Sequence, residues 1–157
     1  MQRYSFVIAI LFYGLAWGSD KGSPSARVPE PESVYKPVTS IVHTMEWILD
    51  PAADAVWDSA GYIITAEGEI DLSPKTGEEW DRVRNGAAIV AESGNLLLMP
   101  GRSVGANWDS YARQLIASGE KALMAAETRN PDALFDAGGL IYQACRGCHS
   151  AYMTGAR

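Results

Sequence analysis

Hydrophobic residues recur every three or four positions along most of this chain, which is the spacing of amphipathic helices. A first helix is predicted from near Ser33, or from Pro37, and its apolar stripe consists of Val38, Ile41, Val42, Met45, Ile48 and Leu49. Asp50 and Pro51 then suit the cap and the first position of a separate helical piece.

A β-like stretch, residues 62–74, interrupts the helical pattern. Its centre, Ala66-Glu67-Gly68, suits the turn of a short hairpin. Because two short strands are marginally stable alone, we expect a ribbon or loop packed on a helical body. Residues 50–75 therefore form a long connection between the first two long helices.

Three further helices follow. Thr76 and Glu79 have the spacing of a capping box, the next helix starts near Asn107, and Asn130 and Pro131 suit the start of the last one. The expected inward faces of the first two are Trp80, Val83, Ala87, Val90, Ala91, Gly94 and Leu97 or Leu98, and Trp108, Tyr111, Leu115, Ile116, Leu123 and Ala126. The last helix carries the hydrophobic residues Leu134, Phe135, Ile141 and Tyr142. The pattern predicts an all-α fold, an antiparallel four-helix bundle.

The N-terminus has the features of an export signal. Arg3 provides a positive start, and residues 6–18 are apolar over a stretch shorter than the ~20 residues of a spanning helix. Ala16 and Gly18 are the small residues of a cleavage site before Ser19. The tryptophan between them fits that site poorly, so an uncleaved membrane anchor is the alternative.

This organisation predicts a signal peptide over residues 1–18, a flexible leader over 19–32 and one domain over 33–157, in a protein exported to the periplasm. The formal net charge of −6 argues against nucleic acid as a partner and disfavours anionic membrane surfaces. The carboxylates form no convincing catalytic pair and no phosphate-binding glycine loop follows a strand, so we do not expect an enzyme.

Both cysteines lie in one motif, Cys-Arg-Gly-Cys-His, over residues 145–149. On a helix Cys145 and Cys148 lie one turn apart on one face, and His149 projects from nearly the same face. Two thiols and an imidazole in this arrangement suit one covalent haem c, with thioether bonds from the cysteines and the histidine on iron. The sequence therefore predicts a c-type haem.

Two other interpretations use the same residues. A thioredoxin-like dithiol belongs at a helix N-terminus in a βαβ setting, whereas this motif ends a helix. A structural zinc needs four ligands, and His43 is the only other histidine, so carboxylates would have to complete the set.

Residues 142–152, Tyr-Gln-Ala-Cys-Arg-Gly-Cys-His-Ser-Ala-Tyr, resemble the class II cytochromes c, the group of cytochrome c′ and cytochrome c-556. The resemblance extends over residues 33–153 in outline, and its specific part is the terminal motif. It implies a haem inside the bundle with the proximal histidine on the last helix, and a possible homodimer through the first two helices. Met153 stands where the family usually has a basic residue.

Members of that family place a first-helix methionine on iron, or leave iron five-coordinate behind an apolar residue. Met45, in the middle of the first apolar stripe, is the expected distal ligand, with an ordinary core methionine as the alternative. Met153, four residues after His149, belongs to the proximal side. The remaining candidates for the distal position are His43, Met99 and Met124.

His/Met ligation implies a monohaem cytochrome that carries electrons between redox proteins. A five-coordinate cytochrome c′-like protein that binds NO or CO is the alternative. Gly138 and Gly139, inside the last helix, indicate a close approach of its backbone to a neighbour, or a local kink. The candidate partners of the haem propionates are Arg82, Arg84, Arg102 and Arg113.

Overall fold

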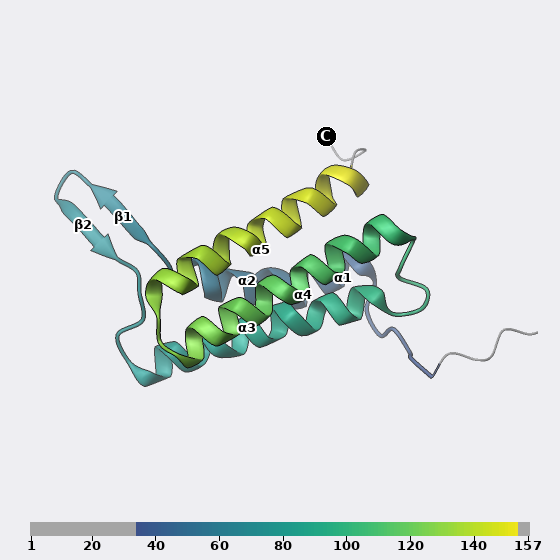
Figure 1. Cartoon of the computed structure of the whole chain (residues 1–157), viewed down its shortest axis with the longest axis horizontal. Coiled ribbons are helices and arrows are strands. Elements are labelled where there is room, and N and C mark those ends of the chain that lie inside the picture. The colour runs from purple at the N-terminus through teal and green to yellow at the C-terminus, as the bar shows by residue number, and fades with distance from the viewer. Residues whose placement is uncertain (1–33, 154–157) are drawn as a thin grey trace, which may run out of the picture. The chain divides into compact units, whose positions relative to one another are not determined.

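The computed structural model describes residues 34–153, so the predicted signal peptide (1–18) and leader (19–32) lie outside the described residues. The described chain is mostly helical, with one two-stranded ribbon, which agrees with the predicted all-α class. Its helical stretches lie side by side, and successive stretches run in opposite directions (Figure 1). None of the helices within residues 34–153 combines the length and the apolar character needed to cross a membrane.

The first helical stretch consists of α1 (Ile41–Thr44), the π-helical turn η1 (Met45–Leu49) and α2 (Asp50–Trp57), which follow one another directly. It starts later than predicted, because the cap is Ser40, whose hydroxyl accepts a hydrogen bond from the His43 N–H at 3.1 Å. Val38, placed in the stripe by the sequence pattern, precedes the helix and is 90% exposed.

The predicted break at Asp50 and Pro51 is absent, because the helix widens there. The Asp50 N–H donates to the carbonyl of Met45, five residues back, where an α-helix would use the residue four back. Proline lacks an N–H and its ring crowds the carbonyl of the fourth residue before it, which for Pro51 is Trp47. The wider turn gives the proline room within a continuous helix.

The remaining helices are α3 (Gly77–Leu98), α4 (Ala106–Glu127) and α5 (Pro131–Tyr152). The capping box at the start of α3 is confirmed: the Glu79 N–H donates to Thr76 Oγ1, and the Thr76 N–H donates to Glu79 Oε2. The cap of α5 is confirmed as well, with the Ala133 N–H donating to Asn130 Oδ1 at 3.0 Å.

The predicted inward face of α3 is buried, and on α4 Trp108, Leu115 and Ala126 are buried. The hydrophobic residues of α5 divide between the core and the surface. Leu134 and Ile141 are fully buried, whereas Phe135 is 59% and Tyr142 56% exposed. The reason is that these two side chains border hollows between α5 and α2. The buried core is formed by Leu49, Ala52, Ala53, Val56, Trp80, Val83, Ala87, Val90, Leu97, Trp108, Ala112, Leu115, Ala122, Ala125, Ala126, Leu134, Ala137, Ile141 and Ala144.

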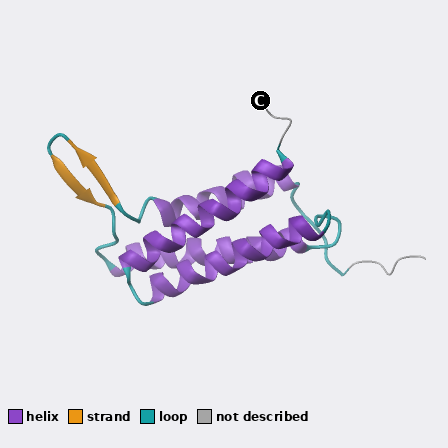
Figure 2. Ribbon diagram, turned by 45° about the horizontal axis from the view of Figure 1, so that its top comes forward, coloured by secondary structure: helices purple, strands orange, loops and turns teal. Residues whose placement is uncertain are grey.

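The predicted hairpin forms, as β1 (Tyr62–Thr65) paired antiparallel with β2 (Gly68–Asp71), in a register that runs from Tyr62↔Asp71 to Thr65↔Gly68. The expectation that it packs on the helices is wrong. Every residue of both strands is exposed, and the ribbon projects away from the helices (Figure 2). Its base is closed by a hydrogen bond from the Leu72 N–H to the Gly61 carbonyl, 3.0 Å long.

Close packing of α3 on α4 depends on glycine. A Cβ atom added at Gly119 would lie 2.6 Å from the backbone nitrogen of Ala91, and one added at Gly94 would lie 2.7 Å from the Ala112 carbonyl oxygen. Both distances are too short for real atoms, so the two backbones approach each other because these positions have no side chain.

We therefore expect Gly119→Ala to lower the free energy of unfolding by about 1–3 kcal/mol, the usual effect of overpacking. Gly139→Ala is the matched control. It also lies within a helix but has nothing within 4 Å of its added Cβ, so it should raise stability by up to about 1 kcal/mol. Urea denaturation measures both changes, and equal stability of Gly119→Ala and the native chain would contradict the close approach.

The ribbon carries one ion pair, between Lys75 and Asp71. The hydrogen bond from Lys75, with those from Ser73, lowers the pKa of Asp71 from 3.8 to about 2. The pair therefore stabilises the fold fully above pH 3.8, and this stabilisation is lost as the pH falls from 3.8 through about 2. Lys75→Met should return the pKa of Asp71 toward 3.8.

The NMR shift of the Asp71 carboxyl carbon measures this titration. Lys121→Met is the matched control, because Lys121 is an exposed lysine on α4, and it should leave the pKa of Asp71 unchanged. A titration midpoint near 3.8 in the native chain would show that the ion pair does not form in solution.

Candidate functional site

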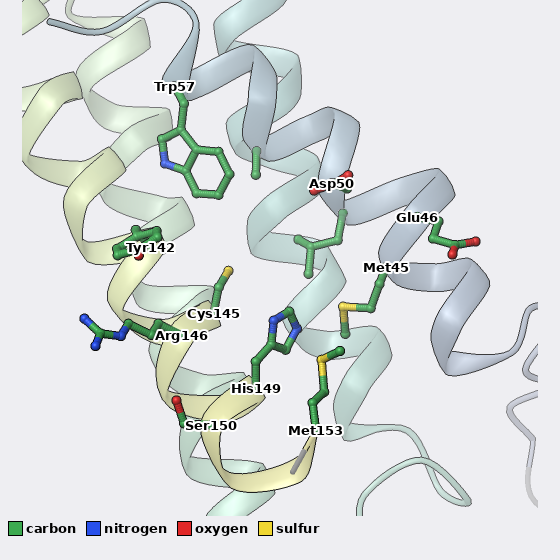
Figure 3. Close-up of a pocket in the computed structure, with 12 residues that line it drawn as sticks. Met45, Glu46, Asp50, Trp57, Tyr142, Cys145, Arg146, His149, Ser150 and Met153 are labelled. Carbon is green, nitrogen blue, oxygen red and sulfur yellow. The ribbon is translucent and has the colours of Figure 1, made fainter. Parts of the chain in front are cut away.

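A cleft with a volume of about 990 Å³ lies between the first helical stretch and α5 (Figure 3). This is the upper end of the range of about 300–1,000 Å³ for small-molecule and cofactor sites. One wall comes from η1 and α2, and the other from the last three turns of α5. The lining residues are Met45, Glu46, Leu49, Asp50, Ala53, Trp57, Tyr142, Cys145, Arg146, His149, Ser150 and Met153.

The α5 wall carries the cysteine motif. Cys145 and His149 line the cleft, and Cys148 lines a smaller adjoining hollow of about 20 Å³ that also includes Cys145 and His149. Gly147 separates Cys148 from Arg146, and a Cβ added there would lie 2.8 Å from Tyr111 Cε1. The glycine inside the motif therefore lets α5 pack closely on α4 where both thiols reach the hollows.

Met45, the first residue of η1, provides a thioether on the opposite wall. Its side chain and that of His149 point into the cleft from the two helices (Figure 3). The wide turn of η1 also brings Asp50 round toward the side of Met45, since one extra residue completes the turn. Glu46 and Asp50 also line the cleft.

A buried hydrogen-bond chain holds the start of the first helix just before Met45. Thr44, fully buried, donates from Oγ1 to the Ser40 carbonyl at 2.8 Å and lies 2.8 Å from Thr39 Oγ1. The guanidinium of Arg102 donates to the Thr39 carbonyl at 2.9 Å and to the Leu96 carbonyl at 3.1 Å. Arg102, a candidate partner of propionates by sequence, instead ties the first helix to the end of α3.

Trp57 marks the other end of the cleft. Its Nε1–H donates to the carbonyl of Gly138 at 3.0 Å, joining α2 to α5. A Cβ added at Gly138 would lie 3.3 Å from Trp57 Cδ1, so the close approach predicted for the glycine pair is found at this position. Gly139 has nothing within 4 Å of an added Cβ.

The other candidate ligands lie elsewhere, with one exception. His43 is exposed and stacks on Trp47, with ring centroids 3.9 Å apart. Met99 and Met124 line neither the cleft nor the adjoining hollow. Met153, assigned to the His149 side by sequence, lies in the cleft as a second thioether.

Arg146 is the cation that sequence analysis missed. It lines the cleft, whereas Arg82, Arg84, Arg102 and Arg113 line neither the cleft nor the hollow beside it. The sequence feature that could have identified Arg146 is its position inside the motif, directly after Cys145. Arg146 and His149 are three residues apart, so they lie on the same side of the helix.

The two alternative chemistries find little support in this geometry. Burial raises the pKa of Cys145 and Cys148, whereas a reactive dithiol needs lowered thiol pKa values. The part of the chain that the structure describes contains no cluster of three or more His, Cys, Asp or Glu side chains arranged to hold a metal ion by themselves.

The residues fit a covalently bound haem. Cys145 and Cys148 lie one helical turn apart and an imidazole follows them. Cys145 and His149 line a cleft that has the size of a cofactor site, and Cys148 lines the adjoining hollow. Comparison of the chain with protein-family models, with curated proteins and with solved structures finds no significant match. The chemistry of the cleft is therefore inferred from its own residues.

Proposed function

We propose that this chain is a monohaem c-type cytochrome of the class II kind, an antiparallel four-helix haem bundle that carries electrons between redox proteins in the periplasm. Cys145 and Cys148 would hold the haem through thioether bonds, His149 would be the proximal ligand of iron, and Met45 the distal one. The supporting observation is the cleft that has the cysteine motif on one wall and Met45 on the other.

Haem iron supplies the electron-carrying chemistry by alternating between two oxidation states. The chain's residues would set the conditions for it. A thioether ligand opposite histidine raises the reduction potential. Leu49, Ala53 and Trp57 contribute apolar side chains to the Met45 wall of the cleft, beside the carboxylates of Glu46 and Asp50. No substrate bond is broken, so the proposed role is that of a carrier and not of an enzyme.

Two features hold Met45 in place, which suits a ligand that must not move between oxidation states. The Arg102–Thr39–Thr44 chain fixes the backbone before it, and the π-helical turn fixes the backbone after it. Redox partners would dock weakly, as short-lived electron-transfer complexes do.

A second candidate function is the binding of NO or CO at five-coordinate iron. The observation that favours it is Leu49, buried and lining both the cleft and the adjoining hollow beside Met45. An apolar side chain in that position leaves room for a diatomic ligand if the thioether does not bind iron.

The covalent attachment of haem to Cys145 and Cys148 is tested by expressing the full chain in cells that have an export pathway and haem-attachment machinery. We expect a coloured protein whose denatured polypeptide carries the added mass of one haem. The double variant Cys145→Ala/Cys148→Ala should lose that added mass, since no other cysteine exists to form a thioether. A colourless native chain at the mass of the bare polypeptide would refute the proposal.

The distal ligand is tested by Met45→Ala, with Met153→Ala, the other thioether of the cleft, as its matched control. Met45→Ala should convert the ferric protein fully from low spin to high spin and remove the weak charge-transfer band of methionine-ligated iron. After reduction, the ferrous variant should bind CO. Met153→Ala should keep the native spectrum. Optical spectroscopy decides, and a native spectrum that is already high spin would favour the gas-binding function.

A further inference from the structure

The β1–β2 hairpin exposes apolar side chains that nothing in residues 34–153 covers. Ile63 and Ile70 are directly opposed in the register and so share one face of the ribbon, where they are 47% and 52% exposed. Tyr62 and Ile64 lie on the other face, and Ile64 is 82% exposed. A two-stranded ribbon usually needs a third strand or a packed helix to be stable, and this one has neither.

The ribbon is nevertheless regular. Its two-residue loop, Ala66 and Glu67, is closed by side-chain bonds: Thr65 Oγ1 donates to the Gly68 carbonyl at 3.1 Å and accepts from the Glu67 N–H at 3.2 Å. Gly68 has a φ of 141°, which a side chain would disfavour. These local bonds hold the apolar side chains in fixed rows, as a contact surface requires.

The charges of this region are acidic. Glu67 and Glu69 lie on the hairpin, and Asp132 and Asp136, at the start of α5, share a crevice with Tyr62 and with Phe135. Lys75 is paired with Asp71, and within the described residues no ion pair joins the other four carboxylates to a cation. The exposed apolar side chains of the hairpin therefore lie beside carboxylates that form no ion pair within the described residues.

A continuous line of hollows connects the hairpin to the cleft. The crevice at the hairpin base shares Phe135 and Asp136 with a hollow of about 690 Å³ along α5, and that hollow shares Trp57 and Tyr142 with the cleft. A partner seated on the hairpin would therefore lie along the same α2–α5 side that the cleft occupies.

We propose that the β1–β2 hairpin is a docking arm for a partner protein whose contact surface has an aliphatic centre and a rim of lysine or arginine side chains. The apolar rows would supply the buried centre of the interface, and the carboxylates would pair with the rim. Opposite charge also speeds the approach of the two surfaces. The proposal concerns the hairpin alone and holds whether or not a haem is attached.

The negative charge of the hairpin favours a cationic partner protein over two other occupants, a second copy of the hairpin and an anionic lipid surface. A second copy of the hairpin would bring Glu67 and Glu69 against the same carboxylates of its mate, which is unfavourable. An anionic lipid surface would be repelled in the same way. A cationic partner turns these carboxylates into attractive groups, and it also covers the isoleucines.

The test uses the full chain in solution and immobilised seven-residue peptides, with binding measured by surface plasmon resonance. A peptide of alternating lysine and valine represents the partner's chemistry, and peptides of alternating glutamate and valine or lysine and serine each lack one part of it. We expect the chain to bind the lysine–valine peptide about tenfold or more tightly than either control peptide, with affinity falling as salt is added.

Variants locate the contact. Glu67→Lys with Glu69→Lys, and separately Ile63→Ser with Ile70→Ser, should each weaken binding about tenfold or more. The matched controls are Glu120→Lys on α4 and Ile89→Ser on α3, exposed residues of the same kinds outside the hairpin, which should bind as the native chain does. A further variant replaces residues 62–71 with a short glycine–serine link and so removes the hairpin entirely. It should lose binding, and this result does not depend on whether the point variants keep the hairpin folded.

Several results would overturn the proposal. They are undiminished binding after replacement of residues 62–71, equal binding of the glutamate–valine peptide, or a dimer in sedimentation that Ile63→Ser with Ile70→Ser abolishes. Partition onto phosphatidylcholine vesicles that depends on Ile64 would assign the hairpin to a membrane instead. None of these outcomes bears on whether Cys145 and Cys148 carry a haem, so the two proposals fail separately.

Discussion

The hydrogen bond from Trp57 Nε1 to the Gly138 carbonyl joins α2 to α5, and the architecture of the candidate site depends on it. Because Gly138 has no side chain, the indole lies directly on the backbone of α5. On one side of this contact lies the cleft lined by Met45 and His149, and on the other the hollow bordered by Phe135. A larger residue at position 138 would push the helices apart and change both.

The rest of the core makes such a cleft possible. Gly94 and Gly119 let α3 and α4 pack closely against each other, and α5 packs on α4 with Gly147 against Tyr111. The first helical stretch is then held at its two ends, by Arg102 and by Trp57. Between those two anchors its inner side faces α5 across the cleft.

Local sequence signals predict the helices well where a capping residue marks the start of the helix. Thr76, Glu79 and Asn130 set the starts of α3 and α5 through bonds to residues three positions away, so their effect is readable from spacing. The local sequence predicts a break in the helix at Pro51, yet the helix continues through this residue. The π-helical turn that permits this packs on α3, and α2 after it packs on both α3 and α5. These tertiary contacts are not readable from the local sequence.

The sequence by itself determined the spacing of Cys145, Cys148 and His149 on one helical face, because that relation lies within a single turn. It also indicated a β-like stretch over residues 62–74 with a turn at Ala66-Glu67-Gly68, without deciding between a ribbon and a loop. Only the tertiary structure decided that Met45 and not Met99 faces the cleft, that Arg102 is buried while Arg146 is not, and that the hairpin is uncovered. Those relations depend on how each helix is rotated and how far its neighbour lies, which no local pattern encodes.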